Sequence, residues 1–263
     1  MTVNLAIIGI GRIGKIHANS IFTHPNAKLV GFFDENNSEI KNFSEKYNSD
    51  FLDIKTIEND HNIDAVVICS PTDTHIDLIK KFSNSGKAIF CEKPIDLDVN
   101  KTIECIDFLN KNKSQFMIGF NRRFDIHFKA LKQHILEGKI GNIETVNIIS
   151  RDPEPPTKDY ISRSGGIFKD MTIHDFDMAI FLLGELPNRV FASGSNLFHK
   201  DIQDEYDFDT ASIILSTESG KQITINNSRR ASYGYDQRIE VHGSLGMISS
   251  ENQRPLSLEI ASK

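Results

Sequence analysis

The sequence is poor in cysteine and has no long apolar segment. Its three cysteines, Cys69, Cys91 and Cys105, form neither a CxxC pair nor a dense disulfide pattern, so we expect a reducing compartment. The start of the chain, MTVNLAIIGIGR, carries no basic cluster, and its apolar run is too short for a signal peptide or a membrane span. These absences make the cytoplasm the expected location.

Positive charge is also scarce. The 30 lysines and arginines are outnumbered by 36 acidic residues, which gives a net charge of −6. This balance argues against nucleic acid or an anionic membrane as the main partner. We find no internal repeat and no low-complexity tract, and we expect no metal site. The 263 residues approach the size at which a single core stops growing, which predicts two domains.

The first 120 residues alternate short apolar runs with helical patterns. The predicted strands are Val3–Ile8, Lys28–Phe33, Ala65–Cys69, Ala88–Cys91 and Phe116–Phe120. Helices are predicted near Lys15–Phe22, Ser38–Lys46, His75–Ser83 and Asn100–Asn110. Such alternation is typical of βαβ units, and continuous apolar strands indicate a parallel sheet covered on both faces.

The second half has a different pattern. It begins with a predicted helix, strand, proline-rich loop and helix, over about Ile126–Glu137, Glu144–Ser150, Arg151–Gly166 and Thr172–Leu183. Only strands follow, at Val190–Ser193, Thr210–Ser216, Gln222–Ser228, Arg238–His242 and Met247–Ser249. Gly220 lies in a turn between two of them, which suggests an antiparallel meander. The boundary is expected near Asn121–Phe124, giving an α/β domain at 1–122 and an α+β domain with a largely antiparallel open sheet at 123–263.

A glycine-rich turn follows the first predicted strand and opens a helix. It reads Gly9-Ile10-Gly11-Arg12-Ile13-Gly14. The first glycine permits the tight turn, the second lets the backbone approach a pyrophosphate, and the third allows close packing of helix on sheet. The helix N-terminus adds free N–H groups and positive potential. This context predicts a Rossmann dinucleotide site, whereas the alternative is a structural turn without a cofactor.

Asp34 closes the second predicted strand, 20 residues after Gly14, where an acid that binds ribose hydroxyls belongs. Its charge would repel a 2′-phosphate and so favours NAD over NADP. Arg12 is the opposing signal, because an arginine can hold a 2′-phosphate, but we expect it to lie along the pyrophosphate.

Glu92-Lys93-Pro94 follows a predicted parallel strand at its carboxyl end, where open α/β sheets bind their ligands. Lys93 would therefore face the cofactor. The alternative is a solvated surface lysine, but the proline restricts Lys93 to an extended backbone and favours a placed residue.

The predicted helix around residue 174 is apolar nearly all round and should be buried. Asp170, His174 and Asp177 nevertheless recur at i, i+4 and i+7, which aligns them on one stripe. Buried ionisable groups are costly unless they are paired or solvated. Asp170 alone could be a helix N-cap and His174 alone a satisfied core residue, but together they favour a general base with its carboxylate.

Several motifs, in order along the chain, resemble the Gfo/Idh/MocA oxidoreductase family. They are the glycine-rich turn, Glu92-Lys93-Pro94, Gly119-Phe-Asn-Arg-Arg123 and Gly165-Gly-Ile-Phe-Lys-Asp170-Met-Thr-Ile-His174-Asp-Phe-Asp177. Ser150-Arg-Asp-Pro, the segment from Asp170 to Asp177, and Tyr233-Gly-Tyr-Asp-Gln-Arg238 resemble its inositol 2-dehydrogenase branch.

The resemblance implies NAD-dependent oxidation of a hydroxyl on a cyclic polyol or sugar, most closely myo-inositol. It implies that Lys93, Asp170 and His174 are catalytic, with His174 removing the hydroxyl proton, Asp170 orienting it and Lys93 stabilising the alkoxide. The remaining hydroxyls would bind Arg123, Asp152, Asp177 and Tyr235. The nicotinamide side of the cofactor would meet Ser70, Pro71, Thr72, His75 and Glu92, with a plain turn and helix start as the alternative for His75.

The resemblance also implies a homo-oligomer, commonly a tetramer formed through the outer face of the second sheet. Members usually continue with a long helix and a further strand, whereas this sequence ends at Lys263, so either the sequence is truncated or the protein dispenses with that segment. A second domain shortened in this way would expose core surface or a sheet edge. Two other interpretations stay open: an NAD(P)-dependent dehydrogenase of another sugar or cyclitol, and a truncated, non-catalytic NAD-binding or regulatory homologue.

Overall fold

The chain folds into two compact units, Met1–Phe120 and Asn121–Lys263. The structure is a computed structural model that describes residues 2–199, 202 and 207–252. The end of the chain from Ser257 to Lys263, on which the expectation of a shortened domain rests, lies outside the described residues.

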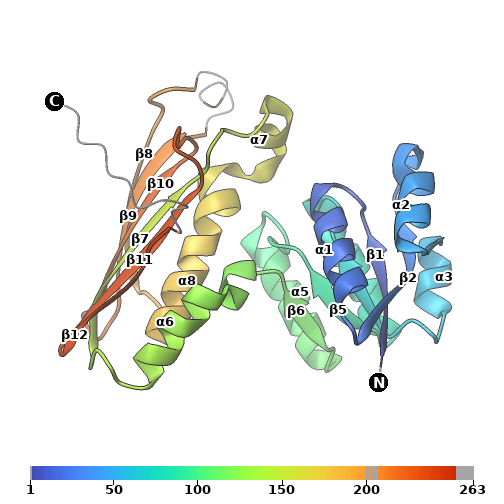
Figure 1. Ribbon diagram of the computed structural model, residues 1–263, viewed down its shortest axis with the longest axis horizontal. Coiled ribbons are helices and arrows are strands. Elements are labelled where there is room, and N and C mark those ends of the chain that lie inside the picture. Colours follow the sequence, from blue (N-terminus) through green and yellow to red (C-terminus); the bar gives the residue numbers. More distant parts are fainter. Residues whose placement is uncertain (1, 200–201, 203–206, 253–263) are drawn as a thin grey trace. The chain divides into compact units, whose positions relative to one another are not determined.

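The N-terminal unit is a parallel sheet of six strands in the order β3-β2-β1-β4-β5-β6 (Figure 1). Its strands are β1 (Val3–Ile8), β2 (Ala27–Phe33), β3 (Asp50–Phe51), β4 (Ala65–Ile68), β5 (Ala88–Cys91) and β6 (Phe116–Ile118). Its helices are α1 (Arg12–Thr23), α2 (Ile40–Tyr47), α3 (Ile54–Asn59), α4 (His75–Asn84) and α5 (Val99–Lys111). Sequence reasoning missed β3 and α3, because segments of two and six residues are too short to show a period.

Successive residues of these strands enter two different cores. In β1, Ala6 and Ile8 pack with residues of α4 and α5, including Phe82. Ile7 packs on the opposite face with residues of α1 and α2, including Phe43. Side chains alternate across a strand, so apolar residues at consecutive positions are required when helices cover both faces. This layering leaves the carboxyl ends of the strands and their loops as the place for polar groups.

The C-terminal unit stacks helices on one face of a second six-stranded sheet. Its helical segments include the 3-10 turn η3 (Asn121–Phe124), α6 (Ile126–Leu136), α7 (Lys158–Ser164), the π-helical turn η4 (Phe168–Thr172) and α8 (Ile173–Leu183). Its strands are β7 (Ile143–Arg151), β8 (Arg189–Ser195), β9 (Thr210–Ser216), β10 (Gln222–Ser228), β11 (Asp236–Gly243) and β12 (Gly246–Ser250). Residues of α6 and α8 join the inner face of the sheet in one apolar core, on the side where Figure 1 shows both helices.

The order of the second sheet is β12-β11-β7-β10-β9-β8. Strands β8, β9 and β10 are antiparallel neighbours, which confirms the predicted meander around Gly220, but β7 separates them from β11 and β12. Strand β7 lies between β10 and β11, parallel to β10 and antiparallel to β11. The predicted loop Arg151–Gly166 contains the helix α7, which ends at Gly165 in the left-handed conformation (φ +81°). The proline cluster predicted a loop throughout, because proline disfavours a helix, but the helix begins only after Thr157.

In the part of the chain that the structure describes, no helix is both long enough and apolar enough to cross a membrane.

The packing of α8 on the sheet predicts a large difference between two leucines. Leu182 is fully buried, whereas Leu186, just beyond the helix, is 70% exposed. Leu182→Ala should lower the free energy of unfolding by about 2–5 kcal/mol, because it removes apolar contacts and leaves a cavity. Leu186→Ala should change it by less than about 0.5 kcal/mol. Denaturant titration measures both, and equal losses would contradict this core.

Candidate active site

The glycine-rich turn joins β1 to α1, and its three glycines have different surroundings. A Cβ on Gly9, which lies at φ +91°, would be 2.6 Å from the backbone N of Ser70, and one on Gly14 would be 2.0 Å from the carbonyl oxygen of Gly9. A Cβ on Gly11 would meet nothing within 4 Å. Gly9 and Gly14 are therefore required by the fold, whereas Gly11 leaves space for a ligand.

This turn fits a bound pyrophosphate. Gly11 is the N-cap of α1, and no side chain caps that end of the helix. The first N–H groups of a helix have no partner within it, and together they attract anions. Arg12, the first residue of α1, is exposed and Ile13 is half-buried beside it.

Asp34 ties the turn to the end of β2. Its Oδ2 accepts a hydrogen bond from the N–H of Ile10 at 2.7 Å, and its Oδ1 accepts one from the N–H of Asn36 at 2.7 Å. Each carboxylate oxygen can accept a second hydrogen bond, so Asp34 can still receive two ribose hydroxyls. The residues present therefore fit NAD, and a 2′-phosphate would meet the negative charge of Asp34.

His75, which is predicted to meet the nicotinamide side of the cofactor, is buried between two loops. Its side chain is 1% exposed, and its ring nitrogens lie 2.8 Å from the carbonyl oxygen of Pro94 and 2.9 Å from that of Ser70. Because both nitrogens are occupied by backbone, His75 joins the loop after β4 to the loop after β5. Pro71 and Thr72 remain at the surface of the first of these loops.

Glu92, at the end of β5, is held by a residue that sequence reasoning missed. Its Oε1 lies 2.7 Å from Nε2 of His17 on α1. His17 stands three residues after Gly14, so its position on the helix that follows the turn was the available signal. Lys93 is half-buried in the next position, and the peptide bond to Pro94 is cis.

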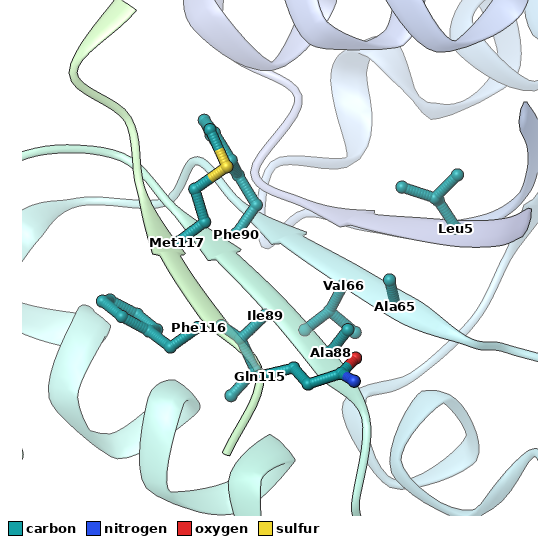
Figure 2. Close-up of a pocket in the computed structure, with 9 residues that line it drawn as sticks. All are labelled: Leu5, Ala65, Val66, Ala88, Ile89, Phe90, Gln115, Phe116 and Met117. Atoms are coloured by element: carbon teal, nitrogen blue, oxygen red, sulfur yellow. The ribbon is translucent and has the colours of Figure 1, made fainter. Parts of the chain in front are cut away.

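The pocket in Figure 2 lies elsewhere in the N-terminal unit. It is lined by apolar side chains of β1, β4, β5 and β6 and by Gln115. None of the nine residues that line it is ionisable, so it offers no acid or base for catalysis.

In the C-terminal unit, Asp170 lies in the π-helical turn η4 rather than at the N-cap of α8, which is Thr172. Its Oδ1 accepts a hydrogen bond from the hydroxyl of Tyr160 at 2.8 Å. His174 is half-buried in the first turn of α8. The predicted single stripe assumed one continuous α-helix, and the π turn changes the angular relation of Asp170 to the residues after it.

Asp177 and Arg123 are paired with each other. Nε of Arg123 lies 2.8 Å from Oδ2 of Asp177, and Nη2 lies 2.6 Å from Oδ1. This two-pronged contact raises the pKa of Arg123. Asp177 is buried and engaged on both oxygens, so it positions Arg123, which keeps donors for a ligand.

Asp152 follows β7 and Tyr235 precedes β11, and their side chains share a hydrogen bond. Burial raises the pKa of Asp152, and the charge of Asp170 raises it further. A hydrogen bond with Tyr235 opposes this shift, as do the charges of Arg229 and Arg122. The structure thus brings together Asp152 and Tyr235, two of the predicted site residues.

Sequence reasoning missed the buried network beneath α8. Asp175 is fully buried, forms an ion pair with Arg122 and accepts a hydrogen bond from Asn227 at 2.7 Å. Nη2 of Arg122 donates to Ser150 Oγ at 2.9 Å. The signal was the helix itself, because an aspartate on a helix that is apolar nearly all round needs a buried partner.

The unequal surroundings of the glycines predict unequal effects of substitution. Gly11→Ala should leave the melting temperature unchanged, since φ is −62° and the added Cβ meets open space. It should weaken dinucleotide binding about tenfold or more, the value of one hydrogen bond to a charged group. Gly14→Ala should lower the melting temperature instead. Calorimetry and titration with NAD separate the two effects, and identical behaviour of the two variants would reject this assignment.

Comparison with protein families and known proteins confirms the resemblance and the fold class. Residues 3–120 match the model described as "Oxidoreductase family, NAD-binding Rossmann fold", and residues 128–249 match the GFO/IDH/MocA C-terminal domain. The chain is 54% identical over 261 residues to an inositol 2-dehydrogenase of Rhizobium meliloti, covering 99% of this chain and 79% of the relative. It is 44% identical to a myo-inositol 2-dehydrogenase of Thermotoga maritima, with 96% of this chain and 76% of the relative covered.

Solved structures agree. A myo-inositol dehydrogenase from Corynebacterium glutamicum superimposes with a TM-score of 0.93 at 41% identity, covering 100% of this chain and 79% of that one. A scyllo-inositol dehydrogenase from Lactobacillus casei, with bound NAD(H) and scyllo-inositol, gives 0.87 at 30% identity, with coverages of 95% and 76%. With both of its domains matched, the chain belongs to the GFO/IDH/MocA family of oxidoreductases and has that family's NAD-binding Rossmann domain.

Proposed function

We propose that this protein oxidises a secondary hydroxyl of myo-inositol, with NAD as the hydride acceptor, to give 2-keto-myo-inositol (scyllo-inosose). The proposal rests on the positions of Asp170, in the π turn η4, and His174, in the first turn of α8. The chain that carries them is 54% identical to an inositol 2-dehydrogenase. NAD, when bound, accepts the hydride from the carbon that carries the reacting hydroxyl.

The residues of this chain supply the proton chemistry. His174 removes the hydroxyl proton as the carbon–hydrogen bond breaks, and general base catalysis of this kind contributes about 10²–10⁴-fold. Asp170 orients the imidazole and stabilises its charged form. Lys93 contributes a positive charge that stabilises the developing alkoxide.

Recognition of the remaining hydroxyls falls to Arg123, Asp152 and Tyr235. Arg123 is held by Asp177 and keeps free donors, while Asp152 and Tyr235 are joined by a hydrogen bond. Sites built from such groups discriminate strongly against analogues without the hydroxyl, because a missing partner leaves a buried polar group unpaired. We therefore expect selectivity to depend on these hydrogen-bond partners.

Replacement of the general base tests the mechanism. His174→Ala should lower kcat by about 10²–10⁴-fold, because the hydroxyl proton then has no acceptor. NAD affinity should be unchanged, since the Rossmann unit keeps all its residues. His61→Ala, at an exposed histidine between α3 and β4, is the control and should match the wild type. Wild-type turnover by His174→Ala would reject the assignment.

A substrate panel tests the function itself. Wild-type protein is assayed for NADH and NADPH formation with myo-inositol, scyllo-inositol and several aldoses. Turnover with NAD and myo-inositol is the expected result. Turnover only with another sugar, or only with NADP, would replace the proposed substrate or cofactor. Dinucleotide binding without turnover on any compound would favour a non-catalytic homologue.

We also propose a cytoplasmic homotetramer. The cysteines are free and buried, in keeping with a reducing compartment. On the outer face of the second sheet, Phe191 and Ile214 are paired in register and exposed by 66% and 48%. Adjacent exposed apolar side chains of this kind are typical of a protein interface.

Ile214→Glu should therefore shift the protein to a smaller species in analytical ultracentrifugation, because it places a charge in the proposed interface. The control is Leu186→Glu, at a leucine beyond α8 that is 70% exposed, which should leave the assembly unchanged. A monomeric wild type would overturn the tetramer.

A further inference from the structure

Arg229 is a buried arginine beside the proposed site. It follows β10 directly, and its side chain is 1% exposed. Its Nη2 lies 3.0 Å from Oδ2 of Asp207, and its Nη1 lies 3.7 Å from Oδ2 of Asp170. Its Nε has no hydrogen-bond partner among the described residues. A buried guanidinium is costly, so its placement between two carboxylates needs a reason.

Asp207 connects this arginine to the start of the π turn. Its Oδ1 accepts the N–H of Ile167 at 2.8 Å, directly before η4. Gly166 lies at φ +82°, and a Cβ there would be 2.7 Å from the same oxygen. The glycine therefore lets the carboxylate of Asp207 approach the backbone that leads into η4.

The two contacts hold the first half of the π turn, one just before it and one at its middle residue. Asp207 binds the N–H at residue 167, and Arg229 reaches the side chain at residue 170. π-Helical turns are rare and depend on their surroundings, because their hydrogen-bond geometry is poorer than that of an α-helix. Arg229 also supplies positive charge between Asp207 and Asp170, and its charge acts on Asp152 as well.

We infer that Arg229 and Asp207 form a positioning pair that sets the place of Asp170 for hydride transfer. The inference rests on the proposed function, in which Asp170 orients His174. Neither residue of the pair is itself catalytic. Displacement of a catalytic carboxylate by about 1 Å costs on the order of 10²-fold in rate.

Pre-steady-state burst kinetics, with the polyol in excess over the enzyme, tests the pair, with whichever polyol the wild type oxidises. Enzyme saturated with NAD is mixed with the polyol, and NADH formation is followed. The amplitude measures the fraction of competent molecules, and the rate constant measures hydride transfer. Arg229→Gln and Asp207→Asn should each lower the rate constant about tenfold to hundredfold while amplitude remains. Asp207→Asn keeps an acceptor for Ile167 N–H, so it decides the question if Arg229→Gln fails to fold.

Two further variants distinguish positioning from simple stability. Arg229→Lys keeps the charge and should restore part of the rate. The double variant, with both Arg229→Gln and Asp207→Asn, should be no slower than Arg229→Gln alone, because the effects of substituting residues that act as a unit do not add. Lys221→Gln is the control, since it breaks an ion pair of 2.9 Å with Glu185 in the same unit and should leave the rate unchanged.

The outcomes separate the two proposals. Loss of amplitude with an unchanged rate constant in both single variants would overturn the positioning pair and leave the proposed function standing. A wild-type protein that forms no NADH with any polyol of the panel would reject the proposed function instead.

Discussion

The stability of the C-terminal unit depends on ion pairs between charged side chains that are buried in it. Asp175 and Asp207 are both buried, and each has an arginine partner, Arg122 or Arg229. An unpaired charge in such a place would destabilise the fold by several kcal/mol, roughly the whole margin of stability of a domain. The same pairs fix helix α8 and the π turn before it. The side chains proposed for catalysis are therefore positioned by contacts that also stabilise the fold.

The N-terminal unit has a different kind of contact at the carboxyl ends of its strands. There, side chains bind backbone atoms of neighbouring loops. Asp34 accepts the N–H of Ile10, and His75 joins the carbonyl oxygens of Ser70 and Pro94. Contacts of this kind fix loop backbones while leaving the loop side chains free. This suits a site that binds its cofactor mainly through backbone N–H groups.

Local patterns predicted much of the fold. The apolar strands of the parallel sheet and helix α8 extend over enough residues to show their pattern. The glycine-rich turn is recognisable from the spacing of its glycines. The insertion of β7 between β10 and β11 was not predictable, because pairing between distant strands leaves no local signal. For the site, sequence reasoning selected Asp177 and Arg123 but not their mutual ion pair, and it overlooked Asp175. Partners of buried charges are set by tertiary packing.

The two hydrogen bonds of Asp34 have a consequence for any change of cofactor preference. Removing its carboxylate would make room for a 2′-phosphate, but it would also release the N–H of Ile10 inside the glycine-rich turn. Selectivity and loop geometry are thus coupled through one side chain. A redesigned NADP-dependent variant needs a neutral acceptor at position 34, such as serine or asparagine, to keep that backbone amide satisfied.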